Sequence, residues 1–142
     1  MLKTRLIHPE ILRALAGAGH GSRVLIADGN YPAATHRAPN ATLVYLNLSP
    51  GVVTVPEVLE ALAATIPIEA AHVMQPADGS TPAIFQEFTR YLPEGMHLQL
   101  LERFAFYEAA SQSSVCLVIA TGEQRIYANL LLTLGVVPPP VT

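Results

Sequence analysis

The sequence is poor in several residue types that would otherwise define its class. Its 142 residues include no tryptophan, one cysteine and only 13% charged side chains. The single cysteine, Cys116, excludes an intramolecular disulfide, and its apolar surroundings in 115–119 predict a small buried side chain. No apolar run reaches the roughly 18 residues of a membrane-spanning helix, and we identify no signal segment before the first predicted helix. We therefore expect a cytoplasmic chain with no membrane partner.

Positive charge is also scarce, and it is dispersed. The eight Lys and Arg residues are scattered along the chain, the net charge is −3 and the pI is near 5.9. Nucleic-acid binding usually requires a basic stripe that neutralises phosphates. We therefore expect no nucleic-acid partner.

Hydrophobic residues, in contrast, make up 51% of the chain. A chain of this length suits one compact domain, which we assign to residues 1–142. Because few charged residues remain to solvate the outside, the apolar content exceeds what one small core requires. The composition therefore favours an oligomer over an isolated monomer.

Predicted helices and strands alternate along the whole chain. Helix starts are indicated by Pro in a first turn, by the Thr54/Glu57 capping box and by apolar residues at helical spacing. Runs of β-branched and apolar residues indicate strands. The predicted helices cover 8–16, 54–65, 81–92 and 104–111, and the predicted strands cover 24–27, 42–48, 70–74, 97–101, 115–120 and 126–134.

This alternation predicts an α/β domain in which helices cover a central sheet. Two junctions lack a helix, one next to the strand that ends at Leu48 and one around Gly122. Parallel neighbours need crossover connections, so junctions without a helix favour a mixed sheet. The chain shows no internal repeat.

His20 and Asp28 form the first candidate site. His20 lies between two glycines, and Asp28 lies at the carboxyl end of the predicted strand 24–27. Ligand sites in α/β sheets favour the carboxyl ends of strands, and flanking glycines let a ligand approach the imidazole closely. Alternatively, His20 is a surface residue of a helix-ending loop and Asp28 caps a turn. The residues alone leave both interpretations open.

Polar and aromatic side chains gather in three further segments. The loop 28–32 combines a carboxylate, an amide and a ring, a mixture that binds sugars but that also suits a β-turn. Arg103 adjoins three aromatic residues and could clamp vicinal hydroxyls, or pair with Glu102 or Glu108. The segment 127–129 offers the hydroxyl of Tyr127 and the amide of Asn129, or it is the second strand of a tight hairpin.

Motifs for other chemistries are missing. The five histidines include no close pair at metal-ligand spacing, and the sequence has no phosphate-binding glycine loop and no nucleophile elbow. We therefore expect no metal and no cofactor. His72 and His97 lie in apolar strand patterns and are predicted to be core or interface residues.

Taken together and in this order, these segments resemble the RbsD/FucU family of sugar mutarotases. The resemblance covers nearly the whole chain and rests on the segments 1–3, 8–12, 19–21, 27–32, 103–108, 121–123 and 127–129. It implies a three-layer α/β/α domain with a mixed central sheet, and an isomerase that interconverts the α and β anomers of a free monosaccharide.

The resemblance also implies roles for individual residues. It makes His20 the catalytic general acid, and it assigns substrate binding to Asp28, Arg103, Tyr127, Ala128 and Asn129. Members of the family are typically decamers of two stacked pentameric rings, with each site at a subunit boundary. The expected partners are therefore a monosaccharide and further copies of the chain.

Two features point to different sugars. Arg103 and the loop 28–32 are similar to the fucose branch, whereas Ala128 is common in the ribose branch. We expect L-fucose as the substrate. A D-ribose-type mutarotase and a non-catalytic sugar-binding accessory protein of an uptake system are the alternatives.

Overall fold

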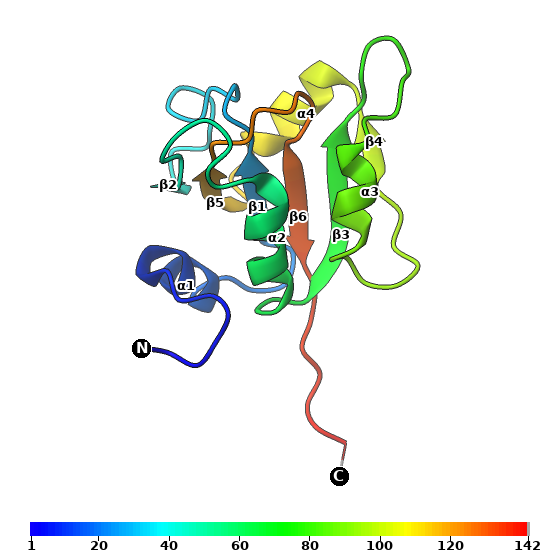
Figure 1. The fold of residues 1–142 in the computed structure, drawn as a ribbon. Helices are drawn as coiled ribbons and strands as arrows, with labels where there is room; N and C mark the ends of the chain where they lie inside the picture. Colours follow the sequence, from blue (N-terminus) through cyan, green and yellow to red (C-terminus); the bar gives the residue numbers. More distant parts are fainter. Residues whose placement is uncertain (142) are drawn as a thin grey trace.

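A six-stranded sheet forms the centre of the fold (Figure 1). The computed structural model describes residues 1–141. The strands are β1 (Arg23–Ala27), β2 (Thr42–Tyr45), β3 (Ile68–Met74), β4 (Gln99–Leu101), β5 (Val115–Ala120) and β6 (Leu130–Leu134). They are arranged in the order β2-β5-β1-β6-β3-β4. Only β6 runs antiparallel to its neighbours, β1 and β3, so the predicted mixed sheet is confirmed.

This topology gives the sheet two distinct edges. The carboxyl ends of β1 to β5 lie together at one edge, where β6 begins. At the opposite edge, β1 to β5 begin and β6 ends. Loops that follow the parallel strands therefore converge with the loop that precedes β6, as ligand sites of α/β folds require.

Helices cover both faces of the sheet, which confirms the three-layer architecture. On one face, α1 (Pro9–Ala16), α2 (Val55–Ala63) and α3 (Ile84–Thr89) share one core with Val24 and Ile26 of β1. On the other face, α4 (Arg103–Ala110) and the segment 31–41 pack on Leu25 and Ala27. Successive residues of β1 thus alternate between two cores, as the pleat of a strand dictates.

Three of the four predicted helix starts are confirmed by their caps, whereas the helix predicted over 81–92 covers only Ile84–Thr89 and begins without a side-chain cap. Thr54 and Glu57 form the capping box of α2, each bonding the backbone amide of the other. The His8 imidazole accepts a hydrogen bond from the amide of Ile11 at the start of α1. The carboxylate of Glu102 caps α4 through the amide of Ala105. These side chains satisfy amides that have no partner within the helix.

Three predicted strands are shorter than expected. The strand predicted over 42–48 ends at Tyr45, because the chain turns back between Ser49 and Val52. The strand predicted over 126–134 begins only at Leu130, because Tyr127 has a φ of +60° and breaks the extended backbone. The strand predicted over 97–101 covers only Gln99–Leu101.

Consequently His97 is exposed in a loop, so of its two predicted places, core or interface, the core is wrong. His72 is half-buried on β3, beside the antiparallel strand β6. Within residues 1–141, no helix has both the length and the apolar content that crossing a membrane requires.

Candidate functional site

A pocket of about 240 Å³ opens at the edge where the parallel strands end. Its walls come from the residues that follow β1, the end of β3, helix α4 and the loop before β6. The lining residues are Asp28, Asn30, Tyr31, Met74, Arg103, Tyr107, Ile126, Tyr127 and Asn129. The pocket therefore brings together four of the side chains predicted from the sequence, namely those of Asp28, Arg103, Tyr127 and Asn129.

Asp28 supplies a fixed and largely desolvated acceptor. It is 5% exposed, and its Oδ1 accepts hydrogen bonds from the amides of Asn30 at 3.0 Å and Tyr31 at 2.9 Å. Burial raises the pKa of this carboxyl, although nearby backbone amides partly oppose the shift. Two amides on one oxygen hold the carboxylate in place, so it can receive a ligand hydroxyl without reorganising.

Asn129 is fixed against the same strand end. Its Oδ1 accepts a hydrogen bond from the backbone amide of Asp28 at 2.8 Å, and its side chain is 5% exposed. With the oxygen engaged, the side-chain NH₂ group is the part left for a ligand. Ala128 before it is fully buried in the core and is not among the residues that line the pocket, so the structure does not bring this predicted binding residue to the site.

Aromatic rings form one wall of the pocket. Tyr31 and Tyr107 stack with their centroids 5.5 Å apart, and the His36 ring lies edge-on to Tyr107 at 4.9 Å. The Tyr31 hydroxyl donates to the carbonyl of His36, and burial raises the pKa of this phenol. Stacking and the Tyr31 hydrogen bond hold these rings in place, which suits the apolar face of a ring-shaped ligand.

Arg103 lies at the rim of the pocket. Its guanidinium lies 5.9 Å from the Tyr107 ring centroid and 6.0 Å from that of Phe104. Within residues 1–141 it forms no ion pair, so the alternative of a salt bridge with Glu102 or Glu108 is wrong. Its charge and donors are thus available to a ligand.

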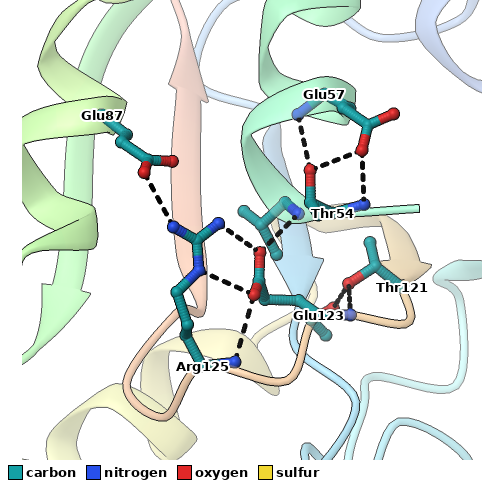
Figure 2. A network of polar contacts seen from close by, with 8 residues as sticks. Thr54, Glu57, Glu87, Thr121, Glu123 and Arg125 are labelled. Atoms are coloured by element: carbon teal, nitrogen blue, oxygen red, sulfur yellow. Dashed lines mark hydrogen bonds and ion pairs between the residues drawn. The ribbon is translucent and has the colours of Figure 1, made fainter. Parts of the chain in front are cut away.

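A buried carboxylate holds the loop 121–129 in place (Figure 2). Glu123 is 2% exposed and accepts hydrogen bonds from Nε and Nη2 of Arg125 at 2.9 and 3.0 Å. It also accepts from the amide of Val55 at the start of α2. Arg125 in turn donates to Glu87 of α3 at 2.8 Å. The network ties the loop that carries Tyr127 and Asn129 to two helices.

The charges of this network stabilise one another. Burial alone would raise the pKa of Glu123, but hydrogen bonds from Arg125 and Val55 and the charge of Arg125 outweigh it, so the pKa is lowered. The hydrogen bond with Glu123 raises the pKa of Arg125. The pair is therefore ionised at neutral pH.

Backbone packing ties the same loop to the strand that precedes Asp28. The Thr121 hydroxyl donates to the carbonyl of Ala27 at 2.7 Å, and the amide of Gly29 donates to the carbonyl of Glu123 at 2.8 Å. A Cβ on Gly122 would lie 2.5 Å from the carbonyls of Ser49 and Val52, so only glycine fits there. The alternative of a tight hairpin over 121–129 is wrong, because β1 lies between β5 and β6.

His20 lies outside this pocket. It precedes β1, whereas Asp28 follows it, and the five residues of β1 separate the two edges by roughly 15 Å at about 3.3 Å per residue. Its Nε2 lies 2.9 Å from Oε1 of Glu69, and the residue is exposed. One chain therefore assembles four of the five predicted binding residues, without Ala128, and it does not bring the predicted general acid to them.

Two lining residues, Met74 and Ile126, were not singled out from the sequence as site residues. Met74 is the last residue of β3, and β3 is parallel to β1, so both end at the same edge. This position at a strand end was the available signal. Ile126 gave no signal, because its place in the pocket depends on how the loop 121–129 folds.

We expect Asp28→Asn to stabilise the unliganded protein while abolishing its ligand binding. Because the pKa of Asp28 is raised, the extra stability of the protonated form is present below the ordinary carboxyl pKa and lost as pH rises through the raised value. Ionised Asp28 thus destabilises the fold at neutral pH. Asparagine keeps Oδ1 for the two amides, so we expect a small rise in Tm, on the order of one or two degrees.

Thermal melts of both proteins at pH 7 and pH 4 test this. The difference in Tm should shrink at the lower pH, where the carboxyl gains a proton. A lower Tm for the variant at pH 7 would contradict the prediction.

The fold and the pocket define an α/β domain with one small, polar, aromatic-walled site at the carboxyl edge of a mixed sheet. Residues 1–137 match the sequence profile of the RbsD / FucU transport protein family. The chain belongs to this family.

Relatives and solved structures agree with this assignment over nearly the whole chain. The chain is 34% identical to a fucose mutarotase of Danio rerio, over 94% of this chain and 92% of that protein. It is 36% identical to the structure of FucU from Bifidobacterium longum, with a TM-score of 0.78 and coverage of 92% and 95%. A fucose mutarotase from Streptococcus pneumoniae, solved with L-fucose, matches at 27% identity and a TM-score of 0.83, covering 97% and 100%.

Proposed function

We propose that the protein is a mutarotase that interconverts the α and β anomers of a free monosaccharide, with L-fucose as its preferred sugar. The observation that carries the proposal is the composition of the pocket. It places a buried carboxylate, a free guanidinium and a side-chain amide around stacked tyrosines. Its volume of about 240 Å³ suits one sugar ring rather than an oligosaccharide.

The chemistry requires only proton transfers. To open the ring, the ring oxygen gains a proton, the anomeric hydroxyl loses one, and the bond between C1 and the ring oxygen breaks as the aldehyde forms. Rotation about the bond to C1 and closure on its other face yield the other anomer. No metal or cofactor is needed, and positioned acid and base groups each contribute about 10²–10⁴-fold.

The pocket residues divide these tasks. Arg103 and Asn129 donate hydrogen bonds to sugar hydroxyls, and the wall of Tyr31 and Tyr107 covers the apolar face of the ring. Asp28 is the acid among the lining residues, and its raised pKa makes its carboxylate a better acceptor for a hydroxyl proton than an exposed aspartate. Tyr127 forms the side of the pocket that the loop 121–129 contributes.

His20 is the proposed proton donor, and it must come from a second copy of the chain. An imidazole suits this role because it can donate a proton from one ring nitrogen while the other is held by a hydrogen bond. Since His20 lies at the edge of the sheet opposite the pocket of its own chain, the His20 that serves a given pocket has to come from a neighbouring copy. Phe104, next to Arg103, and Ile126 are exposed by 73% and 66% near the rim, and such apolar side chains suit a subunit contact.

We therefore propose a homo-oligomer with shared sites, and a decamer of two pentameric rings is the assembly expected from the family resemblance. Arg103 at the rim supports fucose as the substrate. Ala128, a residue common at this position in the ribose branch, leaves a ribose-type substrate as the alternative.

A sugar-binding accessory protein is the second candidate function. The observation that favours it is the position of His20, since a binder needs the pocket but no proton donor. Such a protein would bind a monosaccharide through Asp28, Arg103 and Asn129 without exchanging its anomers.

NMR saturation transfer between the two anomeric proton signals distinguishes these functions. We expect the protein to accelerate exchange for L-fucose more than for D-ribose or D-galactose. Calorimetric binding without acceleration would favour the accessory protein. If no sugar shows exchange above the buffer rate, the mutarotase proposal is wrong.

A further inference from the structure

The imidazole of His20 is held by one carboxylate at the edge of the sheet opposite the pocket. Its Nε2 lies 2.9 Å from Oε1 and 3.2 Å from Oε2 of Glu69, although 49 residues separate the two in the sequence. Within residues 1–141, Nδ1 of His20 makes no hydrogen bond. One ring nitrogen is thus engaged and the other is free.

The backbone around this pair is fixed on three strands. His20 precedes β1 and Glu69 is the second residue of β3, and β6 lies between these two strands. The amide of Gly21 donates to the carbonyl of Leu134 at the end of β6, and the amide of Leu134 donates to the carbonyl of Ser22. Both members of the pair are therefore attached to backbone that the sheet hydrogen-bonds in place.

The end of β6 also passes very close to Glu69. A Cβ on Gly135 would lie 3.3 Å from the Cβ of Glu69, tighter than ordinary contact. The amide of Gly135 donates to the carbonyl of Pro67, just before β3. Glycine at this position leaves the room that the Glu69 side chain needs to reach His20.

Stability does not account for this arrangement. The side chains of His20 and Glu69 are 57% and 50% exposed, and exposed ion pairs contribute little to folding. Their chemistry is more informative. An ionised carboxylate can only accept hydrogen bonds, so the nitrogen that faces it must carry the proton.

We propose that Glu69 is a positioning residue that fixes His20 with its proton on Nε2 and thereby makes Nδ1 the nitrogen that serves the sugar. The inference rests on the proposed function, in which His20 acts in the pocket of a neighbouring copy. Glu69 acts through His20 and does not itself touch the substrate.

The proton transfers balance in this arrangement. In the imidazolium, Nε2–H donates to Glu69 and Nδ1–H donates its proton to the ring oxygen as the bond from C1 to that oxygen breaks. The neutral imidazole that remains keeps its proton on Nε2. On ring closure, Nδ1 takes the proton back from the hydroxyl that becomes the ring oxygen. The Asp28 carboxylate of the pocket accepts the proton of the anomeric hydroxyl on opening and returns it to the new anomeric oxygen on closure. A carboxylate that fixes the tautomer of a catalytic histidine has the same role in serine proteases.

Kinetics of Glu69→Gln and Glu69→Asp in the intact protein provide the first test. A glutamine can accept from or donate to Nε2, so it no longer selects one tautomer. We expect kcat for L-fucose to fall about tenfold or more in the glutamine variant with little change in KM. The aspartate variant should recover part of the loss. Unchanged kcat in the glutamine variant would overturn the proposal.

Two further variants make the test specific. Glu60 lies in another surface ion pair, with Arg5, so Glu60→Gln removes an equivalent charge elsewhere and should keep full kcat. In a His20→Ala background, Glu69→Gln should have no further effect on kcat, since its action passes through the imidazole. A further loss in that background would show that Glu69 acts independently of His20 and would overturn the proposal.

Solid-state ¹⁵N NMR of histidine-labelled protein tests the tautomer without any substrate. The His20 signals are assigned by their loss in His20→Ala. At an alkaline pH, we expect the proton on Nε2 in the wild-type protein and in Glu60→Gln, and a mixture in Glu69→Gln. A wild-type proton on Nδ1 would overturn the inference. Because this readout needs no turnover, it still decides the matter if the protein proves to exchange no sugar.

Discussion

Replacing His20 by alanine is expected to lower the rate of L-fucose anomer exchange by roughly 10²–10⁴-fold, the usual contribution of a positioned acid or base. The loss should affect kcat, because the pocket side chains proposed to bind the sugar lie at the other edge of the sheet. His20 is exposed and its side chain bonds only Glu69 within residues 1–141, so the fold should be unaffected. Saturation transfer gives the rate, and calorimetry gives the affinity.

His97→Ala is the matched control for this experiment. His97 is also an exposed histidine, but it lies in the loop before β4 and does not line the proposed sugar pocket. Its variant should exchange anomers at the wild-type rate. If His20→Ala also keeps the wild-type rate, His20 is not the proton donor.

The second large effect concerns the buried network around Glu123. Glu123→Gln places an NH₂ group where Arg125 and the amide of Val55 both donate, so at least one donor loses its partner. Breaking a buried ion pair from one side costs about 3–5 kcal/mol. Because the Arg125 side chain is 43% exposed, water offsets part of that loss. We therefore expect Glu123→Gln to lower the free energy of unfolding by about 2 kcal/mol.

The same substitution should raise KM for the sugar. The loop 121–129 carries Tyr127 and Asn129 into the pocket, and Glu123 is the group that links it to α2 and, through Arg125, to α3 (Figure 2). Both effects can be measured on one preparation, with unfolding followed at a fixed protein concentration because an oligomer's stability depends on concentration. An unchanged stability and an unchanged KM would contradict the role of the network.

Glu57→Gln provides the comparison. Glu57 caps the same helix end as Glu123 but is exposed, so its loss should cost well under half as much. The pH dependence of stability distinguishes the two substitutions further. The pKa of Glu123 is lowered, so its stabilisation is present above the ordinary carboxyl pKa and lost as pH falls through the lowered value. The difference between wild-type and Glu123→Gln should therefore shrink in acid.

Local signals were enough to predict most of the fold. Thr54 and Glu57 formed the expected capping box, and the junction around Gly122 without a helix correctly indicated a mixed sheet. Strand ends were less predictable, because they depend on tertiary contacts. Because Tyr127 has a positive φ, β6 begins only at Leu130. Neither the identity of Tyr127 nor that of its sequence neighbours predicts this backbone conformation.

The site was predictable where it follows from strand ends. Asp28 follows β1 and Asn129 precedes β6. The two residues lie together at one edge of the sheet because β1 ends where β6 begins. The same reasoning places His20 at the far edge, since it precedes the strand that Asp28 follows. The separation of the two residues was therefore present in the order of residues along the predicted strand 24–27.

Contacts across the sheet were not predictable. The pairing of His20 with Glu69 requires the order β1-β6-β3, which no local pattern reveals. Glu123 lies in a Thr-Gly-Glu run that indicated a turn, and only its fully buried position shows that it holds the loop.

Mixing two inactive variants tests the central claim most directly, because it asks whether His20 and Asp28 of one site come from different copies. His20→Ala and Asp28→Asn are unfolded together, refolded as a mixture, and assayed for L-fucose anomer exchange. In a head-to-tail assembly of equal, randomly mixed copies, about a quarter of the sites pair an intact His20 with an intact Asp28. We expect activity near a quarter of the wild-type rate, from variants that are each inactive alone. A mixture as inactive as its two components would contradict the account.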